Sequence, residues 1–288
     1  MAPFHNASYL NRRLRTDAYY YWGVFVYILK PGTGDRFDST LLAQDYFWLP
    51  PDTPFGNLSA KFFSIGMRLG HVNTRLDEAY SHWWVWKRTQ LTPQPTDADI
   101  VTGGTSLKLH LFATEEAVAG MRRCADELVA TIWYLEKYIE DGTYPSEIKI
   151  DMIGGAVRKC QPASILTDHK DFLDFLNRLS NALKHSFADS DSTLIGNDQP
   201  RATAINYEHN KIKADDADPK LIYAPLGELV TTFNEFLADC FARLKELSDE
   251  IMPKMEVRPV NPKRMRRSIY SYRRRVAHPR PPFIHVRH

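Results

Sequence analysis

Arg178 and His185 are the two residues whose types and spacing best suit acid–base chemistry on a phosphate. They are seven residues apart, so on a helix both side chains lie on one face, separated by about 10.5 Å of helix rise. Histidine exchanges protons near neutral pH, and arginine offers bidentate donors to a phosphate. Such a pair can cleave RNA without a metal. His185 would deprotonate the ribose 2′-hydroxyl or protonate the leaving 5′-oxygen, while Arg178 stabilises the charge on the phosphorane.

A helix is predicted from Thr167 or Asp168 to about Phe187, and it would carry this pair. At 100° per residue, its apolar side chains share one face and its polar side chains form a stripe on the other. The apolar face consists of Phe172, Phe175, Leu176, Leu179, Leu183 and Phe187. The polar stripe consists of Asp171, Asp174, Arg178, Asn181 and His185. We expect Asp174, Asn181 and Lys184 to support the pair.

Arg178, six further residues and then His185, near the end of a bundle helix, resemble the R-x(4–6)-H motif of the HEPN superfamily (higher eukaryotes and prokaryotes nucleotide-binding domains). The string Asn181-Ala182-Leu183-Lys184-His185 adds to the likeness, which covers roughly residues 110–250. The resemblance implies an all-helical domain, commonly a homodimer whose paired motifs form one RNA-cutting cleft. It also implies a toxin or antiphage defence role, with a cognate antitoxin or other protein partner, and Arg178 and His185 as the catalytic residues.

Two other interpretations of the polar stripe stay open. Arg178, Asn181 and His185 also fit a solvated helix face, which is the usual role of polar residues opposite an apolar stripe. The stripe also fits a HEPN-like module without nuclease activity, which would bind nucleic acid or a protein partner.

A basic tail is the second candidate for contact with nucleic acid. Residues 254–288 hold 11 Lys and Arg against one acidic residue, a charge of +10, whereas the rest of the chain holds 26 basic and 34 acidic residues, a charge of −8. Because arginine pairs with phosphates and tyrosine stacks on bases, their interleaving predicts nucleic-acid binding. The residues concerned are Arg264, Arg266, Arg267, Tyr270, Tyr272, Arg273, Arg274 and Arg275. The alternative is a disordered extension that serves solubility or targeting.

The composition is that of a folded protein: 288 residues, 43% hydrophobic and 25% charged. Cys124, Cys160 and Cys240 are odd in number and far apart, which argues against a disulfide framework or a thiolate zinc site and favours a cytoplasmic location. No cofactor or metal is expected, since the common nucleotide, zinc-protease and serine-hydrolase motifs do not occur. The apolar run Tyr19–Leu29 is shorter than the roughly 20 residues of a spanning helix, so we expect no membrane partner.

The elements around the site predict a mainly α fold, a helical bundle with a small β-hairpin-like insertion. We divide the chain into an aromatic-rich N-terminal region (1–104), a HEPN-like bundle (105–252) and the basic tail (253–288). The predicted helices are 114–140, about 168–187 and 226–251, the last stopped by Pro253. Predicted strands are 107–111, 148–152, 202–207 and 221–224. The aromatic cluster around Trp83 and Trp86 is interpreted as core.

Overall fold

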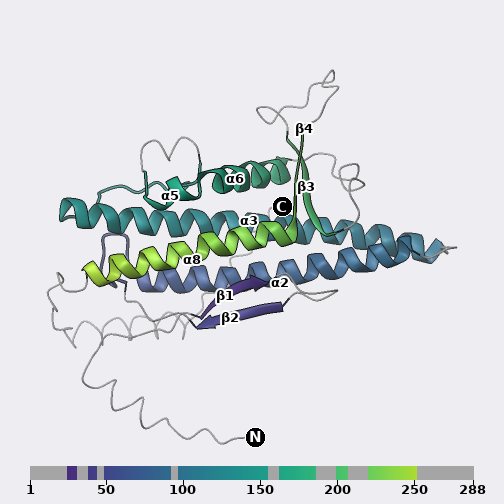
Figure 1. The fold of residues 1–288 in the computed structure, drawn as a ribbon, viewed down its shortest axis with the longest axis horizontal. Helices are drawn as coiled ribbons and strands as arrows, with labels where there is room; N and C mark the ends of the chain where they lie inside the picture. The colour runs from purple at the N-terminus through teal and green to yellow at the C-terminus, as the bar shows by residue number, and fades with distance from the viewer. Residues whose placement is uncertain are drawn as a thin grey trace, which may run out of the picture. The chain divides into compact units, whose positions relative to one another are not determined.

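The computed structural model describes residues 25–30, 38–43, 49–91, 97–154, 162–185, 199–206 and 220–251 (Figure 1). Side chains are described for 49–91, 104–154, 162–184, 199–205 and 221–251. All these residues belong to one compact unit, Trp22–Met252. The predicted basic tail lies outside the described residues.

The fold is mainly α with a small β component, as predicted. The helices are α2 (Leu58–Gln90), α3 (Asp97–Asp141), α5 (Ile165–Asp168), α6 (Lys170–His185) and α8 (Leu226–Ile251). The strands are β1 (Phe25–Lys30), β2 (Asp38–Ala43), β3 (Arg201–Asn206) and β4 (Lys220–Pro225). The helices α2, α6 and α8 each pack against α3, which is the central element of this unit (Figure 1).

The helix α2 begins where the Asn57 side chain accepts a hydrogen bond of 2.9 Å from the Ala60 amide, a typical N-cap. It runs antiparallel to α3, as the ion pairs Arg68–Glu127 and Arg75–Glu116 show. Apolar residues spaced three and four apart bury one face of α2, and Trp83 and Trp86 belong to that face. The interpretation of these two tryptophans as core is therefore confirmed.

The helices α2 and α3 approach each other closely at Gly120. A Cβ built on Gly120 would lie 2.5 Å from Cγ2 of Val72, and the Val72 side chain is fully buried. Alanine favours helix over glycine by about 1 kcal/mol, but it would force Val72 into an already packed core. Glycine at this position allows the two helices to pack closely.

We expect Gly120→Ala to lower the free energy of unfolding by about 1 to 2 kcal/mol, since overpacking outweighs helix propensity. Urea unfolding followed by circular dichroism would measure the change. The matched control is Gly104→Ala in the same helix, where nothing lies within 4 Å of the added Cβ and propensity alone should act. A Gly120→Ala protein as stable as the Gly104→Ala protein would contradict the close approach.

The helices α6 and α8, which also pack against α3, supply much of the rest of the core. Leu176, Leu179 and Leu183 of α6 are buried, which confirms the predicted apolar face for these residues, whereas Phe172 and Phe175 are only half-buried. Leu173, which was not part of that face, is buried as well. The bounds of α8 match the predicted helix. Its phenylalanines pack on Phe172 of α6, and the rings of Phe172 and Phe236 are 6.2 Å apart.

Both pairs of strands are antiparallel. In the β3–β4 hairpin Arg201 faces Pro225 and Asn206 faces Lys220, which confirms the predicted insertion between the second and third long helices. The β1–β2 pair runs from Phe25 opposite Ala43 to Lys30 opposite Asp38, and β1 overlaps the C-terminal part of the apolar run Tyr19–Leu29.

Three sequence-based assignments are wrong. The predicted strand 107–111 is part of α3, where the buried positions are Ser106, His110 and Ala113, at helical spacing, and Leu109 is exposed. The start predicted at Thr114 lies inside α3, which begins at Asp97. The predicted strand 148–152 is irregular chain, with Met152 buried and Gly154 closing a turn onto the Asp151 carbonyl oxygen.

Candidate functional site

The helix α6 carries both predicted catalytic residues. Arg178 is exposed, beside the buried Leu179, and His185 is the last residue of the helix. The structure does not describe the side chain of His185. The positions of Arg178 and His185 are therefore compared through their backbone alone. Their separation of seven residues places both Cα atoms on one side of α6, about two turns apart.

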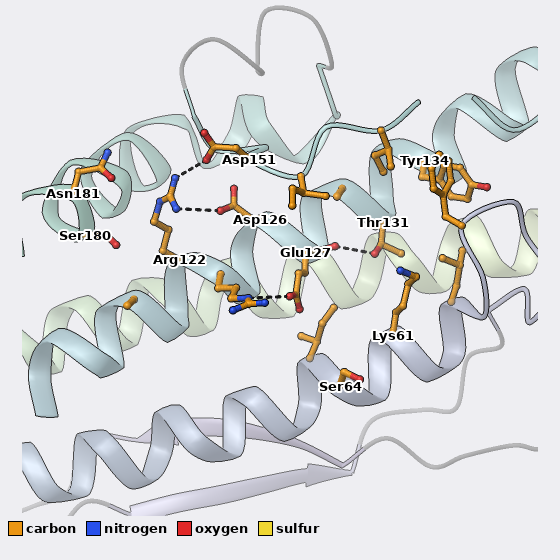
Figure 2. Close-up of a pocket in the computed structure, with 18 of the residues that line it drawn as sticks. Lys61, Ser64, Arg122, Asp126, Glu127, Thr131, Tyr134, Asp151, Ser180 and Asn181 are labelled. Atoms are coloured by element: carbon orange, nitrogen blue, oxygen red, sulfur yellow. Dashed lines mark hydrogen bonds and ion pairs between the residues drawn. The ribbon is translucent and has the colours of Figure 1, made fainter. Parts of the chain in front are cut away.

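A cavity of about 930 Å³ lies between α2, α3, α6 and the segment 148–151 (Figure 2). The predicted supporting residues Asn181 and Lys184 line it together with Ser180, whereas Arg178 and Asp174 are not part of its lining. On the helical wheel Arg178 lies about 60° from Asn181 and about 120° from Lys184. The structure therefore places the predicted supporting residues Asn181 and Lys184 toward the cavity, whereas Arg178 faces solvent.

Arg122 of α3 connects three parts of the chain beside this cavity. Its Nε donates to Oδ1 of Asn177 in α6 at 3.0 Å, and its Nη2 donates to Oδ1 of Asp151 at 2.5 Å. Its Nη1 lies 3.6 Å from Oδ2 of Asp126, one turn further along α3. Asn181 joins the same cluster, because its amide nitrogen lies 3.4 Å from Asn177 Oδ1. The arginine thus holds α6 and the segment around Asp151 against α3. Figure 2 shows its contacts with Asp151 and Asp126.

Asp126 is the titratable cavity residue whose environment is most altered. Its side chain is only 10% exposed, and Oδ1 accepts a hydrogen bond of 2.9 Å from the Ile153 amide. Burial raises the pKa of Asp126 to about 6, although that hydrogen bond and the charge of Arg122 act in the opposite direction. A carboxyl group with such a pKa exchanges protons near neutral pH, which is the property required of a general acid or base.

Sequence reasoning missed Arg122, Asp126 and Asp151. The i,i+4 spacing of Arg122 and Asp126 on a predicted helix was a local signal for an ion pair. Nothing in the sequence connects them to Asp151, 29 residues beyond Arg122, or to Asn177, 55 residues beyond it. Only the packing of α6 and the 148–154 segment on α3 brings these groups together.

His110 is a second buried titratable group, remote in sequence from α6. Its Nδ1 lies 2.8 Å from the carbonyl oxygen of Ala79 in α2, and its Nε2 lies 3.2 Å from that of Arg201 in β3. Burial lowers the pKa of His110, because the loss of hydration outweighs the two carbonyl contacts that favour the imidazolium. His110 therefore connects α2, α3 and β3 through a largely neutral ring.

One prediction concerns residues that the structure does not describe. The tail residues 264–275, predicted to bind nucleic acid, lie outside the described residues. Within the described ranges, no group of three His, Cys, Asp or Glu side chains is arranged to hold a metal ion. Across the same part of the chain, every helix is too short or too polar for a transmembrane span.

The geometry thus defines a helical protein with a polar cavity next to an exposed arginine on α6. Comparison of the chain with protein-family models, with curated proteins and with solved structures finds no match.

Proposed function

We propose that this protein is a HEPN-like module that engages RNA with the C-terminal half of α6 and cleaves it without a metal through Arg178 and His185. The resemblance of the Arg178–His185 segment to the R-x(4–6)-H motif motivates the proposal. In its full form it includes a homodimer that pairs two such segments in one cleft, a role as a toxin or antiphage effector with a cognate antitoxin, and a basic tail that holds the RNA electrostatically.

The observation that carries the proposal is the exposure of Arg178 on a helix whose apolar face is buried. Leu176, Leu179 and Leu183 fix α6 against the core, so the rotation of the helix is set and Arg178 faces outward. Its guanidinium group makes no ion pair with the described residues, which leaves its donors available to a phosphate. His185, two turns further along, occupies the end of the same helix.

The chemistry follows from the two side chains. The neutral imidazole of His185 takes the proton of a ribose 2′-hydroxyl, whose oxygen then attacks the adjacent phosphorus. Arg178 donates to the non-bridging oxygens as charge builds on the phosphorane. The bond to the 5′-oxygen breaks, a proton is returned to that oxygen, and the products are a 2′,3′-cyclic phosphate end and a free 5′-hydroxyl end.

Incubation of the full chain with total cellular RNA in EDTA tests this proposal. We expect cleavage with cyclic phosphate ends, and a loss of about a hundredfold or more for Arg178→Ala and for His185→Ala, the range that general acid–base catalysis supplies. The control is Lys170→Ala, an exposed cation at the other end of α6, which should cleave normally. Undiminished cleavage by both α6 variants would remove the catalytic assignment.

A non-catalytic binding module is the second candidate, and one observation favours it. Asn181 and Lys184, predicted to assist Arg178, line the cavity on a different side of α6. If wild-type protein binds RNA in a gel-shift assay but does not cleave it, and Arg178→Ala weakens binding, this second function holds. Absence of both binding and cleavage would exclude an RNA-directed function for this stretch of α6.

A further inference from the structure

The N-terminal half of α3 presents two large apolar side chains to solvent. Leu109 is 41% exposed and Phe112 is 57% exposed, although the neighbouring residues His110 and Ala113 are buried. Residues three apart on a helix lie on the same side, so Leu109 and Phe112 form one apolar surface. A single exposed apolar residue is common, whereas two on one side of a helix make a candidate contact surface.

Exposed polar residues extend this surface in both directions along α3. Between residues 105 and 116, the exposed residues within about 60° of Phe112 on the helical wheel form what we call the α3 stripe. They are Thr105, Lys108, Leu109, Phe112 and Glu116. The buried residues of the same segment lie about 100° or more from Phe112, and they are Ser106, His110, Ala113 and Thr114. The α3 stripe therefore faces away from the core, and Figure 1 shows this part of α3 continuing alongside α2 past the end of α6.

The two ends of the α3 stripe carry opposite charges. Lys108 lies one turn before Phe112, and it forms no ion pair with the described residues. Glu116 lies one turn after Phe112 and has a side chain that is 55% exposed. Arg75 Nη1 lies 3.4 Å from Oε2 of Glu116 and 2.9 Å from Oε2 of Glu78. Since one arginine serves two carboxylates, this end keeps a negative charge, whereas the Lys108 end is positive.

A surface with this pattern is complementary to a second copy of itself. In a two-fold symmetric contact, the same patch of both subunits meets, so a residue on one side of the axis faces a residue on the other side. If two α3 helices pair antiparallel with the axis at Phe112, Lys108 lies opposite the partner's Glu116, because both are four residues from Phe112. A parallel pair would place Lys108 opposite the partner's Lys108, which is repulsive.

We propose that two copies of this protein associate through the α3 stripe, with the two α3 helices antiparallel and Phe112 at the two-fold axis. Phe112 packs on the partner's Phe112, Leu109 lies beside them, and two Lys108–Glu116 pairs close the ends. An aromatic centre with a charged rim is the common arrangement of residues in protein interfaces. Because the α3 stripe spans only about three helical turns, we expect a weak and reversible association.

This inference deepens the proposed function and rests on the homodimer that it includes, for which it names the contact surface. The helix α6 runs antiparallel to α3, since Asn177 bonds to Arg122 and, further along α6, Lys184 lines the cavity with Glu115. The C-terminal end of α6 is therefore directed toward the part of α3 that carries the α3 stripe. A two-fold axis at Phe112 consequently brings the C-terminal ends of the two α6 helices toward each other.

Sedimentation velocity of the full chain over a range of protein concentrations tests the association. We expect a monomer–dimer equilibrium for the wild type. Phe112→Asp places two carboxylates at the axis and should weaken the association at least about tenfold. The matched control is Met67→Asp, which adds the same charge at an exposed apolar position of α2 outside the α3 stripe and should associate like the wild type. A wild type that is monomeric at every concentration would overturn the proposal, as would a Phe112→Asp protein that associates normally.

Charge reversal tests the antiparallel register. Lys108→Glu and Glu116→Lys each bring like charges together at both ends of the contact, so each variant alone should associate about tenfold more weakly than the wild type. An equimolar mixture of the two should form a heterodimer, because every facing pair is again of opposite charge. Recovery on mixing would also show that both variants are folded. A mixture that associates no better than its components, with normal circular dichroism, would overturn the pairing.

The association and the cleavage of RNA can fail separately. A wild-type protein that dimerises through the α3 stripe but leaves RNA intact would support the interface and remove the cleavage. A monomeric wild-type protein that releases cyclic phosphate ends would overturn the interface and leave the assignment of Arg178 and His185 in place.

Discussion

Replacing Asp126 by asparagine is expected to raise the free energy of unfolding relative to wild type, by an amount that grows as the pH rises from 4 to about 6 and then stays constant up to pH 8. Burial raises the pKa of Asp126 from its ordinary value of 3.8 to about 6. Between these values the folded protein holds a proton that the unfolded chain has released, so wild-type stability falls as the pH rises. The loss ends above about pH 6, once the carboxyl group is ionised in both states.

The size of this effect is up to about 3 kcal/mol, since each tenfold change in proton affinity is worth about 1.4 kcal/mol. Asparagine keeps an oxygen that accepts from the Ile153 amide but carries no charge to desolvate. The two proteins should therefore be nearly equal in stability at pH 4 and diverge above it. Urea unfolding at four or five pH values, monitored by circular dichroism, measures the difference.

Asp151→Asn is the matched control. It removes the exposed carboxylate that shares Arg122, with 58% of its side chain accessible. If the buried position of Asp126 causes the slope, the Asp151 variant should not reproduce it. A flat difference between Asp126→Asn and wild type across this pH range would show that Asp126 is not desolvated in the folded protein.

Replacing His110 by phenylalanine is expected to destabilise the protein by about 1 to 3 kcal/mol at pH 8. Phenylalanine fills the space of the imidazole but cannot donate to the carbonyl oxygen of Ala79 or contact that of Arg201. A buried carbonyl group that loses its donor bears the cost of desolvation without compensation. The ring of His110 is only 3% exposed, so water does not replace the lost donor.

The pH dependence of this second variant has the opposite sign. Burial lowers the pKa of His110 below its ordinary value of 6.5, so the unfolded chain binds the proton more readily. The stability that neutral His110 provides is complete above about pH 6.5 and is lost as the pH falls below it. The difference between wild type and His110→Phe should therefore shrink from pH 7 to pH 5. His71→Phe, at an exposed position of α2, is the control, and a difference that grows on acidification would refute the burial argument.

These opposite slopes oppose each other in the pH profile of the wild-type protein. Asp126 weakens the fold as the pH rises toward 6, whereas His110 strengthens it as the pH rises toward 6.5. A shallow wild-type profile is therefore compatible with two contributions of opposite sign. The variants Asp126→Asn and His110→Phe measure the two contributions separately.

The sequence predicted best the elements whose local pattern and packing agree. The bounds of α8, Leu226–Ile251, follow from one apolar face and from Pro253, and the β3–β4 hairpin follows from two short β-prone runs. Residues 107–111 misled because alternating leucines imitate a strand, although the burial of Ser106 and His110 follows helical spacing. Which side of a five-residue segment is buried depends on residues far away in the sequence. For His110 these residues are Ala79 and Arg201, whose carbonyl oxygens contact its ring.

The candidate site was predicted in part for the same reason. The position of Arg178 on the outward face of α6 follows from the spacing of the leucines on its other face. The cavity does not follow from the sequence, because Lys61, Asp126 and Lys184 come from three helices and meet only through tertiary packing.

The 45 residues of α3 form one continuous helix, about 66 Å long at 1.5 Å per residue. It passes without a break through position 104, where the composition of the chain changes. Its N-terminal half packs on α2 near Ala79, and Tyr134 in its C-terminal half stacks on Tyr144 of the segment after α3. The helix α2 and the described part of the bundle consequently share their central helix, so unfolding of either would expose the core of the other, and we expect the two to unfold as one cooperative unit.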